Sequence, residues 1–74
     1  MSEADKMFAE LGYRRVDTEQ CKNIYRNRFG SHIYFDNKNK SIDLAGRQNK
    51  NKILTLKQLR AINKKCKELG WLDE

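Results

Sequence analysis

Hydrophobic residues recur with a helical period at both ends of the chain and with a period of two between them. Near the N-terminus, four apolar residues fall at positions i, i+3, i+4 and i+7, on one side of a helix: Ala4, Met7, Phe8 and Leu11. Ser2 and Asp5 resemble a capping box, Gly12 can end the helix as a left-handed residue, and Tyr13 can fold back onto it. The pattern predicts a short N-terminal helix.

A second helix is predicted from Thr55 to Leu69. Thr55 is placed as the N-cap, Gln58 completes a capping box, and Gly70 ends the helix so that Trp71 can fold back onto it. The side predicted to face the core carries Leu56, Leu59, Ile62, Cys66 and Leu69.

Apolar and polar residues alternate between the helices, which is typical of half-buried strands. A hairpin with Lys38 and Asn39 as its two-residue loop pairs Phe35 with Ile42 and Ile33 with Leu44. Before it, a three-residue loop at 29–31 gives two further pairs: Tyr25 with Phe35, and Asn27 with Ile33. A Gly30-Ser31 loop is rejected, because that one-residue slip turns charged side chains into the core.

A further strand is expected at 13–17, a turn or loop at 18–23, and a polar loop at 46–52. The sequence therefore predicts one small α+β domain over residues 1–74. In it, an antiparallel meander of three or four strands packs against the C-terminal helix, with a short N-terminal helix in addition. The pattern leaves open whether that first helix covers the outer face of the sheet. A domain of this size offers little room for a deep pocket.

Positive charge is concentrated in the C-terminal third. The formal net charge is +6, and the segment from Gly46 to Lys67 contains eight Lys or Arg residues and no Asp or Glu. Such a balance attracts polyanions, namely nucleic acid, an anionic lipid surface or an acidic protein face.

Catalytic chemistry has little support in the sequence. His32 is the only histidine, and no carboxylate is evidently placed to orient it as a general base. Cys21 and Cys66 lack metal-ligand spacing and are expected to be free thiols in the cytoplasm. No glycine-rich phosphate motif occurs, and no apolar run has the ~20 residues of a membrane span. We therefore expect a cytoplasmic protein that is not an enzyme and carries no cofactor or metal.

Two basic surfaces are candidates for binding. One side of the C-terminal helix carries four cationic residues: Lys57, Arg60, Lys64 and Lys67. The outer face of the predicted sheet carries Arg26, Arg28, His32 and Tyr34, with Asp43 beside them. Arginine and aromatic side chains on a β surface can contact phosphates and bases.

Four segments resemble small proteins of phages and mobile elements in Gram-positive bacteria. These are Phe8–Tyr13, Ile33–Asp36, Ile53–Ile62 and Glu68–Trp71, together 24 of the 74 residues. The resemblance supplies no catalytic residues and implies a bacterial cytosolic setting with an accessory role. In architecture alone, a sheet followed by a C-terminal helix is also similar to the arm-site DNA-binding domains of conjugative-transposon integrases.

Two functions of different classes fit these observations. The first is a non-enzymatic module that binds nucleic acid through one of the two basic surfaces. The alternative is a phage or mobile-element protein that binds and modulates a host protein, with its basic surface against an acidic partner. An exposed patch of aliphatic and aromatic residues favours the second, and a steep salt dependence of DNA binding favours the first.

Overall fold

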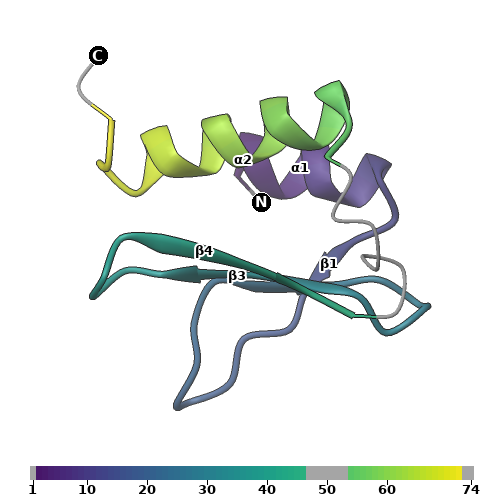
Figure 1. Cartoon of the computed structure of the whole chain (residues 1–74), viewed down its shortest axis with the longest axis horizontal. Helices are drawn as coiled ribbons and strands as arrows, with labels where there is room; N and C mark the ends of the chain where they lie inside the picture. The colour runs from purple at the N-terminus through teal and green to yellow at the C-terminus, as the bar shows by residue number, and fades with distance from the viewer. Residues whose placement is uncertain (1, 47–53, 73–74) are drawn as a thin grey trace.

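The structure, a computed structural model, describes residues 2–46 and 54–72. Its helices and strands follow one another along the chain as α1 (Glu3–Glu10), β1 (Arg14–Arg15), β2 (Ile24–Arg26), β3 (His32–Asp36), β4 (Ser41–Ala45) and α2 (Leu56–Glu68). The strands form one antiparallel sheet in the order β1-β2-β3-β4 (Figure 1). The predicted α+β class is confirmed, with four strands. Apart from Gly46, the polar loop predicted at 46–52 lies outside the described residues.

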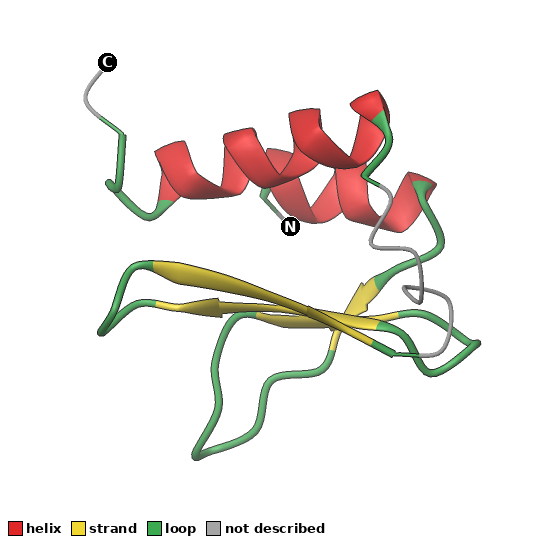
Figure 2. Ribbon diagram, viewed as in Figure 1, coloured by secondary structure: helices red, strands yellow, loops and turns green. Residues whose placement is uncertain are grey.

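Both helices lie on the same side of the sheet (Figure 2). The first helix therefore does not cover the outer face, which answers the question that the sequence left open. The loop between β1 and β2 extends on the side of the sheet away from the helices (Figure 1). The molecule thus has a helical layer and, behind it, a sheet face that no helix covers.

The helix ends follow the predicted capping rules. Thr55 and Gln58 form a complete capping box at the start of α2. At the other end, Gly70 has a φ of +77° and the Trp71 N–H donates to the Cys66 carbonyl at 2.9 Å. This bond gives a partner to one of the carbonyls that have no hydrogen-bond donor within the last turn of a helix.

The N-terminal helix, α1, also ends at a glycine with positive φ that is followed by an aromatic residue. Gly12 has a φ of +88°, and the Tyr13 N–H donates to the Phe8 carbonyl at 2.9 Å. At the start of the helix, the Ser2 hydroxyl accepts a hydrogen bond from the Asp5 N–H at 3.1 Å. The Asp5 carboxylate accepts from the Tyr25 hydroxyl of β2 instead of completing a box. One carboxylate thus ties the first turn of α1 to the sheet.

The β3–β4 hairpin has the predicted pairs, Phe35 with Ile42 and Ile33 with Leu44. Its loop is longer than predicted, because pairing stops at Asp36 and Ser41 and leaves residues 37–40 to make the turn. The Asp36 carboxylate accepts hydrogen bonds from two turn amides, those of Lys38 and Asn39. This side chain replaces the ladder bonds that a tight two-residue loop would have formed.

The predicted β2–β3 pairing is wrong by two residues. Tyr25 pairs with Ile33 rather than Phe35, and the loop is 28–30. The cause is local: the side-chain oxygen of Asn27 accepts hydrogen bonds from the N–H groups of Phe29 and Ser31, at 3.0 and 2.9 Å. A shift of two residues leaves every side chain on the same face of the sheet. The residues predicted to face the core, Tyr25, Ile33 and Phe35, therefore still do so.

The predicted buried side of α2 is partly wrong. Leu56 and Leu59 are 61% and 49% exposed, and the buried residues of the helix are Ala61, Ile62, Lys65 and Cys66. The helix is turned so that the Lys65 ammonium lies 5.6 Å from the centre of the Tyr25 ring. The hydrophobic pattern does not predict a lysine on the inner side, because it counts only apolar residues toward the core.

The core lies between the helical layer and the sheet. Its buried members are Phe8, Tyr13, Tyr25, Ile33, Phe35, Ala61, Ile62 and Cys66. Phe8 of α1 stacks on Tyr25 with ring centres 4.3 Å apart and meets Phe35 edge-on at 6.0 Å. Aromatic pairs of this kind add about 0.5–1.5 kcal/mol beyond the area they bury. Phe8 therefore connects α1 to two strands.

The two thiols differ in burial, which gives a measurable difference in reactivity. Cys66 is buried, and burial raises the pKa of its thiol, while Cys21 is half-buried outside the core. We expect a thiol reagent at pH 8 to modify Cys21 at least about tenfold faster than Cys66, because the thiolate is the reacting species. Labelling followed by mass spectrometry checks this. In denaturant the two rates should converge, and equal rates in the native protein would contradict the placement of Cys66.

Charged groups gather where α1, α2 and the sheet meet. The Asp5 carboxylate accepts from the Tyr25 hydroxyl at 2.5 Å and pairs with Arg15 at 3.4 Å. Burial raises the pKa of Asp5, but the Tyr25 hydrogen bond and the positive charges of Arg15 and Lys65 outweigh it. The pKa of Asp5 therefore lies below its ordinary value, which means that the folded state favours the ionised carboxylate.

The lowered pKa of Asp5 predicts a loss of stability in acid. The contribution of Asp5 is complete above about pH 4, the ordinary pKa, and is lost as pH falls through the lower pKa of the folded chain. Urea unfolding of the wild type and of Asp5→Asn at pH 7 and at acidic pH measures it. The stability difference between the two proteins should shrink in acid. A difference that stays constant with pH would contradict the assigned role of the carboxylate.

Candidate nucleic-acid interface

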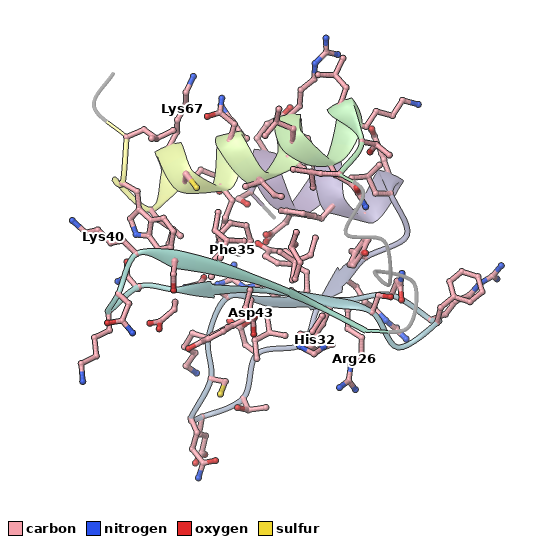
Figure 3. The ribbon with its side chains drawn as sticks, in the orientation of Figure 1. Arg26, His32, Phe35, Lys40, Asp43 and Lys67 are labelled. Atoms are coloured by element: carbon pink, nitrogen blue, oxygen red, sulfur yellow. The ribbon has the colours of Figure 1, made fainter. Side chains whose placement is uncertain are left out.

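Three cationic or titratable side chains form a row across the outer face of the sheet. Arg14 of β1 pairs with Arg26 of β2, and Arg26 pairs with His32 of β3. Figure 3 shows Arg26 and His32 pointing away from the helices, while Phe35 points toward them. Because side chains directly opposite on neighbouring strands have Cβ atoms ~4.5–5.5 Å apart, this row concentrates positive charge.

The two arginines of β1 lie on opposite faces of the sheet and differ in their ion pairing. Arg15, on the inner side, forms salt bridges with Asp5 and Asp17 at 3.4 and 3.0 Å. Within residues 2–46 and 54–72, neither Arg14 nor Arg26 forms a salt bridge with a carboxylate. Like charges directly opposite each other destabilise a sheet. An anion bound between Arg14 and Arg26 would offset this repulsion.

The tip of the β2–β3 hairpin adds a further arginine and an aromatic ring. The Arg28 guanidinium lies 5.0 Å from the centre of the Phe29 ring, and Phe29 is 53% exposed. An open groove of about 840 Å³ runs between the end of α1 and this hairpin, with Arg14, Arg26, Arg28 and Phe29 in its lining. Cationic and aromatic groups thus meet along one depression at the β1 edge.

The other half of the outer face is different in charge. Tyr34 of β3 stands between Ile24 and Asp43, and Asp36 pairs with Ser41. Partial burial raises the pKa of the Tyr34 hydroxyl, and Asp36 and Cys21 raise it further. The hydroxyl therefore stays protonated at neutral pH and can donate a hydrogen bond. Arg14, Arg26 and His32 therefore lie in the half of this face formed by β1, β2 and the start of β3.

The basic residues predicted on the C-terminal helix lie in the other layer. Lys57, Arg60 and Lys67 are exposed and Lys64 is half-buried. Lys57 and Arg60 line a small depression together with Glu10 of α1. The segment from Gly46 to Lys67 contains no Asp or Glu, but in the folded chain Glu10 of α1 lies beside Lys57 and Arg60 of this segment.

The structure keeps the two predicted surfaces apart. Arg26 and His32 are direct neighbours, Arg28 joins them from the hairpin, and Tyr34 lies on the same face. Sequence reasoning missed Arg14 and Phe29. Two signals were present: Arg14 is the second residue of the expected strand at 13–17, and Phe29 lies in the predicted loop, where a large aromatic residue is exposed.

Among residues 2–46 and 54–72, no three His, Cys, Asp or Glu side chains lie close enough to hold a metal ion. Of the helices in this part of the chain, neither is long and apolar enough to cross a membrane. No protein-family model, curated protein or solved structure matches the chain. Function is therefore inferred from the side chains themselves.

Proposed function

We propose that this chain is a small non-enzymatic module that binds nucleic acid through the half of the outer sheet face formed by Arg14, Arg26, Arg28 and His32. The observation that carries the proposal is the direct cross-strand pair of Arg14 and Arg26, which no carboxylate among the described residues neutralises. A guanidinium group matches the geometry of a phosphate and binds it with two parallel hydrogen bonds.

The sheet surface is favoured over the helix surface by the position of the acidic side chains. Glu10 lies in the same depression as Lys57 and Arg60 and opposes an approaching phosphate. Glu10 also lines the groove between the end of α1 and the β2–β3 hairpin, but three arginines line that groove with it: Arg14, Arg26 and Arg28. The electrostatic attraction for a polyanion is therefore strongest along the arginine side of the groove.

Exposed aromatic rings favour a single strand over a duplex. Phe29 is exposed beside Arg28, and Tyr34 is partly accessible on the same face. Bases of a single strand can stack on such rings, and this stacking tolerates any sequence. We therefore propose weak, sequence-tolerant binding to single-stranded nucleic acid.

The proposed setting is the cytoplasm, with an accessory role in a phage or mobile element. Both cysteines are free in the structure, which fits a reducing compartment. The alternative is a phage or mobile-element protein that binds and modulates a host protein, with a basic surface against an acidic partner.

Salt dependence tests the proposed function. Fluorescence anisotropy with labelled single-stranded DNA, single-stranded RNA and duplex DNA should show the tightest binding to a single strand. Log affinity should fall linearly with log salt, with a slope near −0.7 per phosphate neutralised on a single strand. Three arginines in contact give an expected slope of about −2. No detectable binding to any of the three probes at about 50 mM salt would overturn the proposal.

A further inference from the structure

The groove between the end of α1 and the β2–β3 hairpin has two chemically different walls. Figure 1 shows these two segments at the same end of the molecule. The wall formed by β1, β2 and the hairpin contributes three arginines, whose side chains only donate hydrogen bonds: Arg14, Arg26 and Arg28. The wall formed by the end of α1 contributes Glu10, whose ionised carboxylate only accepts them. A ligand that fits both walls therefore carries acceptors on one edge and donors on another.

Glu10 is the last residue of α1, where a negative charge is locally unfavourable. The C-terminal end of a helix carries a partial negative charge that repels a carboxylate, and the last turn of α1 contains no basic residue. Among residues 2–46 and 54–72, Glu10 forms no salt bridge, although Lys57 and Arg60 share a small depression with it. The Glu10 side chain is exposed, so its carboxylate is accessible to a ligand that offers N–H groups.

The groove also has the size and the apolar surface of a small-ligand site. Its volume of about 840 Å³ lies within the ~300–1,000 Å³ of pockets that hold small ligands. Leu11 and Val16 are half-buried in its lining, and Phe29 adds an exposed ring. Aliphatic and aromatic surfaces suit the flat face of a nucleobase. The lining therefore fits a planar base that has hydrogen-bonding groups along its edges.

Guanine is the base whose edges match these walls. Its Watson–Crick edge presents two adjacent donors, the N1–H and the N2 amino group, and the two oxygens of a carboxylate can accept from both. Its O6 and N7 are acceptors that an arginine can bind together. Adenine and cytosine place an acceptor nitrogen beside their amino group, and thymine and uracil carry a carbonyl on each side of one N–H. On each of these other bases, a carboxylate meets an acceptor as well as a donor.

We propose that the groove holds one guanine of the bound strand, with its Watson–Crick edge donating to Glu10 and its O6 and N7 toward the arginine wall. This inference rests on the proposed nucleic-acid binding and adds a base preference to it. Strands without guanine still bind, because phosphate contacts and stacking do not distinguish the bases. Glu10 is thus the specificity-determining residue of the groove.

Exchanging a single base in a short strand tests the preference. The probes are labelled DNA strands of thymidine with guanine, adenine, cytosine, thymine or hypoxanthine at the central position, together with the matching RNA strands of uridine. In fluorescence anisotropy, the guanine strand should bind at least about fivefold tighter than the others, the lower end for a contact with two hydrogen bonds to a base. Hypoxanthine lacks only the N2 amino group of guanine, so its strand should lose the preference.

Replacing Glu10 by glutamine separates base recognition from charge. In Glu10→Gln the amide has only one accepting atom, so the preference for guanine should fall below about twofold. The loss of a negative charge should at the same time raise the affinity for the strand of thymidine alone. Phe29→Ala, an exposed residue in the lining of the same groove, is the matched control. It should weaken the binding of all strands by a similar factor and keep the guanine preference.

The outcomes distinguish this inference from the proposed function. Equal affinity for all central bases, or a guanine preference that Glu10→Gln leaves unchanged, would overturn the guanine site while nucleic-acid binding stands. The same holds if Glu10→Gln raises the affinity for every strand by one factor, because Glu10 would then act through its charge alone. A hypoxanthine strand that binds as tightly as the guanine strand would overturn the contact with the N2 amino group. No binding of any strand would overturn the proposed function itself.

Discussion

Replacing Phe8 by alanine should lower the free energy of unfolding by about 3–5 kcal/mol, the range for a buried aromatic residue cut to alanine. Phe8 is fully buried and contacts three rings, those of Tyr13, Tyr25 and Phe35. Since a domain of this size has a stability of only a few kcal/mol, the variant should be largely unfolded at 37 °C. Circular dichroism during urea and thermal unfolding measures the loss.

The matched control for Phe8 is a leucine of α2. Leu59 is 49% exposed, so Leu59→Ala removes little buried area and should cost less than about 1 kcal/mol. From the sequence alone, which placed Leu59 in the core, the expected cost is about 2–5 kcal/mol. A loss with Leu59→Ala as large as that with Phe8→Ala would show that α2 is turned as the sequence predicted.

Reversing the charge of Arg14 and Arg26 together should weaken the binding of single-stranded nucleic acid by about a hundredfold. Each substitution to glutamate removes a charge-assisted hydrogen bond, worth ~1.5–3 kcal/mol, and adds repulsion toward phosphate. Both side chains lie on the exposed outer face, so the fold should remain intact, and their mutual repulsion is removed. Anisotropy titrations at fixed salt measure the affinity.

The control for the arginine pair is a charge reversal on the other surface. Lys57 and Lys64 changed to glutamate alter the net charge by the same amount, from +6 to +2, because each substitution subtracts two charges. At physiological salt the Debye length is ~8 Å, so charges in the helical layer are largely screened from the sheet face. The lysine variant should lose no more than about threefold. Equal losses in the two variants would mean that net charge alone governs binding.

Local signals were enough to predict how the helices begin and end and how the β3–β4 pair aligns. Thr55 with Gln58, and Gly70 before Trp71, act through hydrogen bonds within a few residues of one another. Such short-range bonds depend on the identity of neighbouring residues, which a sequence displays directly.

The rotation of α2 could not be predicted in the same way. Lys65 is buried because Tyr25 presents its ring and Asp5 a nearby carboxylate, and both come from segments at least 40 residues away in the chain. The β2–β3 register was missed for the opposite reason: a shift of two residues preserves the faces, so hydrophobic alternation does not distinguish the two pairings. The candidate site shows the same limit, since the pairing of Arg26 with His32 depends on that register and the pairing of Arg14 with Arg26 depends on the β1–β2 register.

The hydrogen bond from the Ala4 N–H to the Glu68 carboxylate joins residues 64 positions apart and has a consequence for the order of folding. The two hairpins of β2, β3 and β4 close short loops, whereas α1 gains this contact only when the last turn of α2 is in place. Closing short loops costs less chain entropy, so the hairpins are expected to form early and the docking of the helices late. On the ribosome, the first helix to be synthesised is therefore among the last to reach its final position.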